Sequence, residues 1–182
     1  MTLLKRQIIL FFFLLLSFYL VSGSVNSASQ TYDEYAIKTA FLFRSLHYVE
    51  WSKKNSSDNL IVICITDPDN FSKTIYSLRH RTVNGRTIEL RNLASLEEIQ
   101  TCDILHLPMM KSSQLHKTLA KIENNNILTI SDQPGFAKSG VILNFPLDGQ
   151  KVTIEVNVDA ANRQNIKFSA KLLRIAKIIG NK

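Results

Sequence analysis

The sequence is poor in the residues that build the commonest chemical sites. It contains two cysteines, four histidines and six glycines in 182 residues. Cys64 and Cys102 are too far apart for a CxxC redox motif. The histidines lack the short spacings of a zinc site, and the sequence has no glycine-rich phosphate loop and no G-x-S-x-G motif. These absences argue against a metal centre, a resident cofactor and a catalytic function.

Long runs of like charge are also missing, although the chain carries a formal net charge of +7. A nucleic-acid-binding domain gathers Lys and Arg on one face or along one helix. Here the basic residues are spread along the chain, and no basic run with interleaved aromatic residues occurs. We therefore do not expect a nucleic-acid partner.

One long apolar run is present, near the N-terminus. Residues 8–21 (IILFFFLLLSFYLV) follow Lys5 and Arg6 and precede a small, polar stretch. A basic start, a short apolar core and a small-residue exit are typical of a secretory signal peptide. The run is short of the about 20 residues that span a bilayer. We therefore expect a signal peptide over residues 1–28, cut between 24 and 29, and one domain over 29–182. An uncleaved N-terminal anchor is the alternative.

Export makes the two cysteines informative, because an oxidising compartment permits a disulfide between Cys64 and Cys102. Closing a loop of this length stabilises a protein by about 4 kcal/mol in the chain-entropy model. The alternative is that Cys64, inside the apolar run LIVICI (60–65), is a buried free thiol that packs as a small hydrophobe.

The rest of the chain alternates between helix and strand patterns. Thr31 and Glu34 have the spacing of a capping box, which predicts a helix that starts there and ends at Trp51. Its apolar stripe leaves Lys38 outside. The continuous apolar run 60–66 is typical of a strand buried on both faces. Further strands are expected at 86–93, 102–108 and 127–132, and further helices at 71–79, 95–98 and 112–122.

The C-terminal third changes its pattern. Residues 140–145 and 151–158 read as two strands of a hairpin, joined through Leu-Asp-Gly. Residues 168–179 (FSAKLLRIAKII) have the period of an amphipathic helix that closes the chain. The fold expected is therefore α/β: a single layered domain with a mixed, largely parallel sheet flanked by helices, and with a C-terminal hairpin and helix.

Acidic residues at two strand ends suggest a ligand cleft. Asp67 follows the strand at 60–66, Asp132 follows the strand at 127–131, and Phe136 is close in sequence. Ligands bind at the carboxyl ends of parallel strands, so a small-molecule cleft is one interpretation. The alternative is that these are turn and capping residues. His106, within the strand at 102–108, is expected to be a structural histidine with its hydrogen bonds satisfied.

Two features suggest protein partners. Lys171, Arg174 and Lys177 would share one side of the last helix, and such a ridge suits an acidic partner. A solvated helix face is the alternative. The first helix is rich in aromatic residues, which indicates core packing, with a homodimer or a docking groove as alternatives. These residues are Tyr32, Tyr35, Phe41, Phe43, Tyr48 and Trp51.

Five blocks of sequence occur in an order known from one family. They are EYAIKTAFLFRSLHYVEW, RTVNGRTIELRNL, CDILHL, LTISDQPGFAKSGVILNF and VTIEVNVDAANRQNIKFSAKLLRIA. Over residues 33–179 the chain resembles the YfiR-like family of periplasmic bacterial proteins. The resemblance implies a non-catalytic periplasmic regulator without a cofactor. It would bind the periplasmic sensor domain of an inner-membrane diguanylate cyclase and repress cyclic di-GMP synthesis, and with it biofilm formation.

The resemblance also implies a second protein partner, and the chain differs from better-known members of the family in its cysteines. An outer-membrane peptidoglycan-associated lipoprotein draws the family's regulators away from the cyclase. Better-known members carry a second cysteine pair in the C-terminal half, which this chain lacks. Any redox response must therefore rest on Cys64 and Cys102, which match cysteine positions of the family. The alternative function is a periplasmic receptor domain for a small molecule, bound at Asp67 and Asp132.

Overall fold

The computed structural model describes residues 27–52 and 59–180. Contacts divide the chain into two units, residues 1–33 and 34–182. The first unit contributes only the beginning of helix α2 (Ser27–Leu46) to the described residues, and everything below concerns the second. The predicted signal peptide lies almost entirely outside the described residues. No helix in the described ranges is long and apolar enough to cross a membrane.

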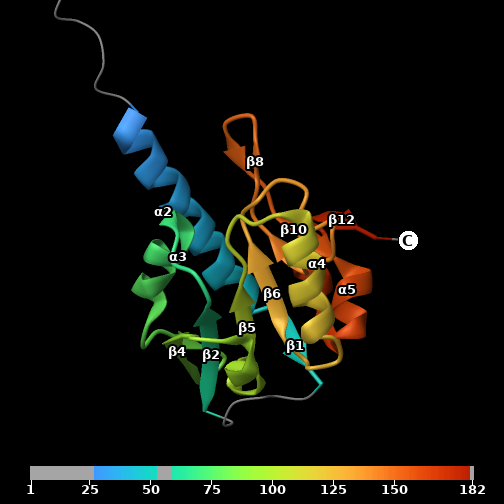
Figure 1. The fold of residues 1–182 in the computed structure, drawn as a ribbon. Helices are drawn as coiled ribbons and strands as arrows, with labels where there is room; N and C mark the ends of the chain where they lie inside the picture. The colour runs from blue at the N-terminus through green and yellow to red at the C-terminus, as the bar shows by residue number, and fades with distance from the viewer. Residues whose placement is uncertain (1–26, 53–58, 181–182) are drawn as a thin grey trace, which may run out of the picture. The chain divides into compact units, whose positions relative to one another are not determined.

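An eight-stranded sheet forms the centre of the domain (Figure 1). Its five middle strands run parallel, a short strand β3 lies antiparallel at one edge, and β10 is antiparallel to β7 near the other. The outermost strand, β12, is parallel to β10. The prediction of a mixed, largely parallel sheet is confirmed. In spatial order the strands are β12 (Lys177–Ile179), β10 (Glu155–Asn157), β7 (Leu143–Asn144), β6 (Leu128–Ser131), β5 (Ile104–His106), β2 (Leu60–Ile65), β4 (Arg86–Asn92) and β3 (Thr82–Val83).

Helices cover both faces of this sheet, as the alternating pattern predicts. Besides α2 they are α3 (Asn70–Ile75), the 3₁₀ turns η1 (Tyr76–Leu78) and η2 (Leu96–Thr101), α4 (Ser112–Lys121), α5 (Val158–Arg163) and the short α6 (Ala170–Leu173). In Figure 1, α2 and α3 lie well apart from α4. Ser95 caps η2 through its side chain, as expected.

Strand β2 shows how the two faces are filled. Ile61, Ile63 and Ile65 pack into a first core, together with residues of α2 and α3. Val62 and Cys64 point the other way into a second core, together with residues of η2 and α4. Successive side chains of a strand alternate between faces, so a strand covered on both sides must be apolar throughout. The unbroken run of apolar residues in β2 has this origin.

The first helix differs from the prediction at both ends. It begins at Ser27, so Thr31 lies inside the helix and is not its N-cap. It ends at Leu46, and Trp51 belongs to a separate strand, β1 (Val49–Trp51). This strand pairs antiparallel with β11 (Ile166–Phe168), more than a hundred residues further along the chain. The local sequence pattern could not predict this strand, because its pairing partner is so distant in sequence.

The C-terminal third contains the expected hairpin and a helix, but the helix is much shorter than predicted. Strands β7 and β10 form the hairpin, with a small ladder of β8 (Leu147–Asp148) and β9 (Lys151–Val152) at its tip. Within 168–179 only Ala170–Leu173 is helical. Of the remaining residues, Phe168 ends β11 and Lys177–Ile179 form β12. Strand β12 is held against β10, where the Lys177 N–H donates to the Ile154 carbonyl at 2.8 Å.

Candidate functional site

The carboxyl edge of the parallel strands gathers several ionisable side chains. His106 is the last residue of β5, and Asp132 directly follows β6. Asp69 follows β2 and is the N-cap of α3, where its side chain accepts from the Ser72 N–H. Lys38 reaches the same edge from α2. The parallel topology brings these positions together because the three strands end on the same side of the sheet.

Lys38 and Asp132 form a buried ion pair. The Lys38 Nζ lies 2.7 Å from Asp132 Oδ2, and the two side chains are 3% and 4% exposed. Lys38 also pairs with Glu34, one helical turn earlier. Burial lowers the pKa of Lys38, but the hydrogen bonds and charges of Asp132 and Glu34 outweigh burial, so the pKa is raised. The lysine therefore stays charged and fastens α2 to the end of β6.

His106 lies beside this pair and is wholly buried. Its Nε2 is 3.5 Å from Asp69 Oδ2, and the ring of Phe71 meets the imidazole edge-on with centroids 5.6 Å apart. Among the described residues, neither ring nitrogen has a hydrogen-bond partner. Burial lowers the pKa of His106, while the charges of Asp69 and Asp132 oppose that shift. The expectation that the hydrogen bonds of His106 are satisfied is therefore wrong.

Polar contacts continue from this cluster across the sheet. Gln133 donates to Asp132 Oδ1 at 2.7 Å, and its backbone carbonyl accepts from Asn144 Nδ2 at 2.9 Å. Asn144 Nδ2 also lies 3.2 Å from Glu155 Oε2, and Glu155 pairs with Lys177 at 3.2 Å. A line of polar contacts therefore connects helix α2 with the outermost strand β12.

The residues predicted to form the ligand cleft have three different environments. Asp132 is buried in the ion pair with Lys38, Asp67 is exposed, and Phe136 packs partly against the second core. Asp69, and not Asp67, faces His106. The surface hollows described below are lined by other residues, so a cleft at these three positions stays a prediction.

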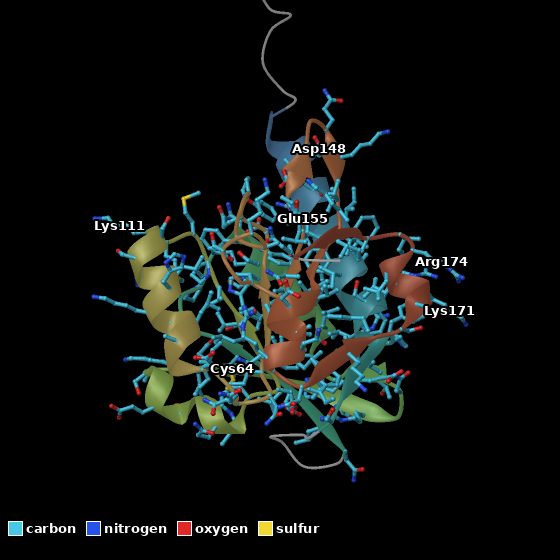
Figure 2. All side chains as sticks on the ribbon, turned by 90° about the vertical axis from the view of Figure 1, so that its right-hand side faces the viewer. Cys64, Lys111, Asp148, Glu155, Lys171 and Arg174 are labelled. Atoms are coloured by element: carbon cyan, nitrogen blue, oxygen red, sulfur yellow. A yellow bond between two sulfur atoms is a disulfide. The ribbon has the colours of Figure 1, made fainter. Side chains whose placement is uncertain are left out.

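The predicted basic ridge is divided between two elements. Lys171 lies in α6 and Arg174 is its C-cap, and Figure 2 shows both side chains projecting from the same flank. Lys177 lies in β12, so the three residues do not share one helix face, and that part of the prediction is wrong. Ile175 is 70% exposed between them.

A hollow of about 650 Å³ adjoins this exposed isoleucine. It lies between α2 and the C-terminal segments and has apolar, aromatic and basic lining residues. Among them are Phe41, Arg44, Tyr48, Leu172, Ile175 and Lys177. We call Lys171, Arg174, Ile175, Lys177 and this hollow the C-terminal surface.

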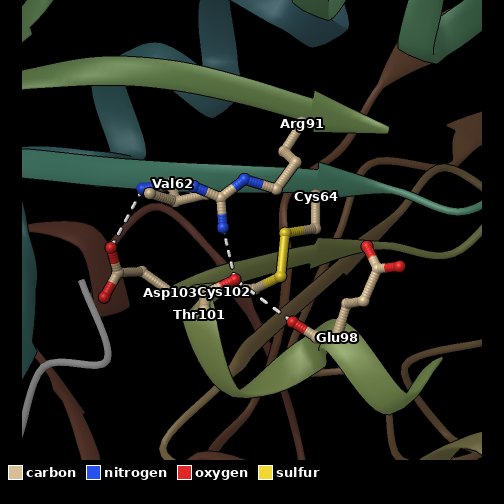
Figure 3. Close-up of a disulfide and its surroundings, with 7 residues drawn as sticks. All are labelled: Val62, Cys64, Arg91, Glu98, Thr101, Cys102 and Asp103. Atoms are coloured by element: carbon tan, nitrogen blue, oxygen red, sulfur yellow. Dashed lines mark hydrogen bonds between the residues drawn. A yellow bond between two sulfur atoms is a disulfide. The ribbon is translucent and has the colours of Figure 1, made fainter. Parts of the chain in front are cut away.

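Cys64 and Cys102 form a disulfide, with their Cα atoms 5.9 Å apart (Figure 3). Both cysteines are wholly buried in the second core, and the free-thiol alternative for Cys64 is wrong. The bond joins β2 to Cys102, which directly follows η2 and precedes β5 by two residues. Next to it, the buried Asp103 carboxylate accepts from the Val62 N–H at 2.9 Å and lies 3.4 Å from Arg86 Nη2. A covalent bond and a charged cluster thus fix the same pair of strands.

Comparison with solved structures shows the fold. A crystal structure of a conserved domain protein from Vibrio cholerae O1 biovar El Tor strain N16961 is 8% identical, with a TM-score of 0.51. The match covers 80% of this chain and 60% of that one. An ABC domain in complex with L-Trp from Streptococcus pneumonia is 11% identical, with a TM-score of 0.47, covering 69% of this chain and 57% of that one. The chain thus spans about 60% of the length of these two proteins.

A family model identifies the chain far more specifically. The model described as YfiR/HmsC-like matches residues 35–177. This range includes the disulfide, the whole C-terminal surface and the carboxyl-edge cluster, by which we mean Lys38, Asp69, His106 and Asp132. The family is known for periplasmic regulators of cyclic di-GMP signalling, and as regulatory rather than catalytic. From the match over most of its length, the chain belongs to the YfiR/HmsC-like family.

Proposed function

We propose that the protein is a non-catalytic periplasmic repressor of an inner-membrane diguanylate cyclase. It binds the cyclase's periplasmic sensor domain and lowers cyclic di-GMP synthesis through that contact alone. The observation that carries this proposal is the family match over residues 35–177. The five sequence blocks of the YfiR-like resemblance, in family order, support it.

The repression has a simple thermodynamic form. A sensor domain exchanges between an active and an inactive conformation, and a bound protein shifts that balance only by its difference in affinity for the two. The repressor therefore binds the inactive conformation more tightly. A competitor for the repressor restores activity by mass action, and we propose an outer-membrane peptidoglycan-associated lipoprotein in that role.

The C-terminal surface is the proposed contact with the cyclase. Ile175 is a large apolar side chain left 70% exposed, and covering it in a complex is favourable in proportion to the apolar area removed from water. Arg174 directly precedes it and Lys177 follows two residues later, and Arg is frequent among the residues that dominate binding energy. An acidic, partly apolar patch on the sensor domain complements this surface, and opposite charges also speed association.

The test is the intracellular concentration of cyclic di-GMP in the native host, with the gene intact, deleted and restored. Deletion is expected to raise the concentration and restoration to lower it again. Immunoblotting of a periplasmic fraction checks that the protein is present in the intact and restored strains. An unchanged concentration with the protein present would contradict the proposal.

A further inference from the structure

A second hollow lies along α2 and shares Arg44 and Tyr48 with the hollow of the C-terminal surface. Its volume is about 660 Å³, within the range of small-molecule sites. One wall is a face of α2, and the other is formed by the end of η1 and the residues that follow. The lining residues are Ala36, Thr39, Ala40, Phe43, Arg44, His47, Tyr48, Ser77, Leu78 and Arg81.

Two alanines of α2 line one end of the hollow. Ala36 and Ala40 are both exposed and are one helical turn apart, and Phe43 follows on the same face. A larger residue at either alanine would fill the space between α2 and η1. This end therefore offers an apolar floor without a charged group.

The opposite end is cationic. Arg44, His47 and Arg81 lie there, and no carboxylate lines the hollow. The Arg81 guanidinium stacks over the Phe43 ring at 4.3 Å from its centroid. Within the described residues, neither Arg44 nor Arg81 takes part in an ion pair. Two exposed arginines thus present their charge to the hollow without an acidic partner in the part of the chain that the structure describes.

His47 is oriented by its own helix. Its Nδ1 lies 3.0 Å from the Phe43 carbonyl, and because a carbonyl only accepts, Nδ1 carries the proton in this bond. The imidazole also meets the Phe43 ring edge-on, with centroids 5.1 Å apart. Phe43 is therefore held between Arg81 and His47, and the aromatic face and the charges have fixed relative positions.

We propose that this hollow binds a small organic anion, with a carboxylate or phosphate group on a flat or linear apolar body. The anionic group lies between Arg44 and Arg81, where guanidinium groups form paired, charge-assisted hydrogen bonds with such oxygens. The apolar body covers Ala40 and Phe43. The proposal goes beyond the repressor function and does not depend on it, since it concerns ligand binding by the isolated protein.

The test is isothermal titration calorimetry of the purified exported domain with four probes. 2-Naphthoate and octanoate carry a carboxylate on a flat and on a linear apolar body, 2-naphthalenemethanol is the neutral counterpart, and inorganic phosphate has no apolar body. At least one carboxylate is expected to bind at least tenfold more tightly than both the neutral compound and phosphate. Amide shifts in a ¹H–¹⁵N NMR spectrum are expected at Ala40 and Phe43.

Variants locate the binding. Arg44→Gln and Arg81→Gln are each expected to weaken binding of the carboxylate by about tenfold, the usual effect of losing a charge-assisted hydrogen bond. Arg79→Gln is the matched control, because Arg79 is also exposed and lies over the Tyr76 ring at 5.7 Å but does not line the hollow. Ala40→Leu fills the apolar end without a change of charge and is expected to abolish binding.

Three outcomes would overturn the proposal. One is equal affinity for 2-naphthoate and 2-naphthalenemethanol, which would show that no anion is recognised. The second is binding of a carboxylate that Arg44→Gln, Arg81→Gln and Ala40→Leu all leave unchanged. The third is the absence of binding by both carboxylates at millimolar concentration. Circular dichroism of each variant verifies that it is folded.

Discussion

The Lys38 ammonium and the Asp132 carboxylate form an ion pair at 2.7 Å, and both side chains are almost completely buried. One belongs to the first helix of the domain and the other to the end of a central strand, 94 residues later. Each charge is tolerated in the interior only because the other neutralises it. Helix α2 is therefore positioned by an interaction that is costly to break from either side.

Removing one partner of this pair is expected to destabilise the protein strongly. Lys38→Met should lower the free energy of unfolding by about 3–5 kcal/mol, because Asp132 then stays buried without its counter-ion. The double variant Lys38→Met/Asp132→Leu should recover much of the loss, since the one carboxylate left without Lys38 is then Glu34, which is 21% exposed and reached by water. Urea unfolding followed by circular dichroism measures both. A single variant as stable as the exposed control Lys111→Met would contradict the buried pair.

Acidification is expected to weaken the fold through His106. Burial holds the pKa of His106 below its ordinary value of 6.5, so below pH 6.5 the unfolded chain binds a proton at this residue that the folded chain resists. The free energy of unfolding therefore falls as the pH decreases from 6.5, by up to about 1.4 kcal/mol per pH unit from this group. Urea midpoints between pH 7.5 and 5 measure the slope.

The variant His106→Leu separates this effect from the other groups that titrate in acid. Its midpoint should change less between pH 7.5 and 5 than that of the parent protein, because the titrating imidazole is gone. His116→Leu is the matched control, since His116 is exposed on α4 and is expected to leave the slope as it is. If the two leucine variants show the same slope, His106 does not govern the acid response.

The disulfide is expected to contribute substantially to stability. The sequence separation of 38 residues corresponds to about 4 kcal/mol in the chain-entropy model, so Cys64→Ala/Cys102→Ala should lower the free energy of unfolding by about that amount. Alkylation with iodoacetamide before and after reduction reports the state of the thiols. Labelling of both cysteines in the unreduced, denatured protein would show that the bond is absent.

Charge reversal at the C-terminal surface is expected to weaken repression. Arg174→Glu replaces an attractive charge with a repulsive one, and Ile175→Asp removes the exposed apolar side chain. Either variant, restored to the deletion strain, should leave cyclic di-GMP above the level of the parent gene. Lys111→Glu is the control, because Lys111 lies far from Lys171 and Arg174 in Figure 2. Full repression by both variants would reject this surface but not the repressor function.

The central sheet could be predicted from the sequence because its signal is local. A strand buried on both faces must be apolar at every position, and residues 60–65 show that directly. The hairpin turn at Asn84 and Gly85 has an equally local origin, because an Asn-Gly pair readily adopts the positive φ that both residues show. The partners of the disulfide could be predicted because the chain contains only two cysteines, Cys64 and Cys102.

The misassigned elements depend on partners that are distant in sequence. Residues 168–179 have a helical period, yet Lys177–Ile179 gain more by completing the sheet beside β10 than by extending α6. Trp51, predicted to end the first helix, similarly lies in β1 and is paired with Ile166 of β11. The sequence pattern places Lys38 off the apolar stripe of the first helix. Its ion pair with Asp132 could not be predicted, because the fold alone brings α2 to the carboxyl edge of the sheet. The spacing of Glu34 and Lys38, one helical turn apart, was the one local hint.

The doubly covered strand β2 also bears on how members of this family can diverge. Every side chain from Ile61 to Ile65 touches one of the two cores, and Cys64 is in addition covalently bound. Packed interiors accept exchanges that conserve volume and reject most others. Evolution therefore has little freedom in this strand, whereas the exposed positions of α2, such as Ala36 and Ala40, can change without disturbing the fold. Differences in specificity among relatives should accumulate on that helix while the strand beneath it stays nearly constant.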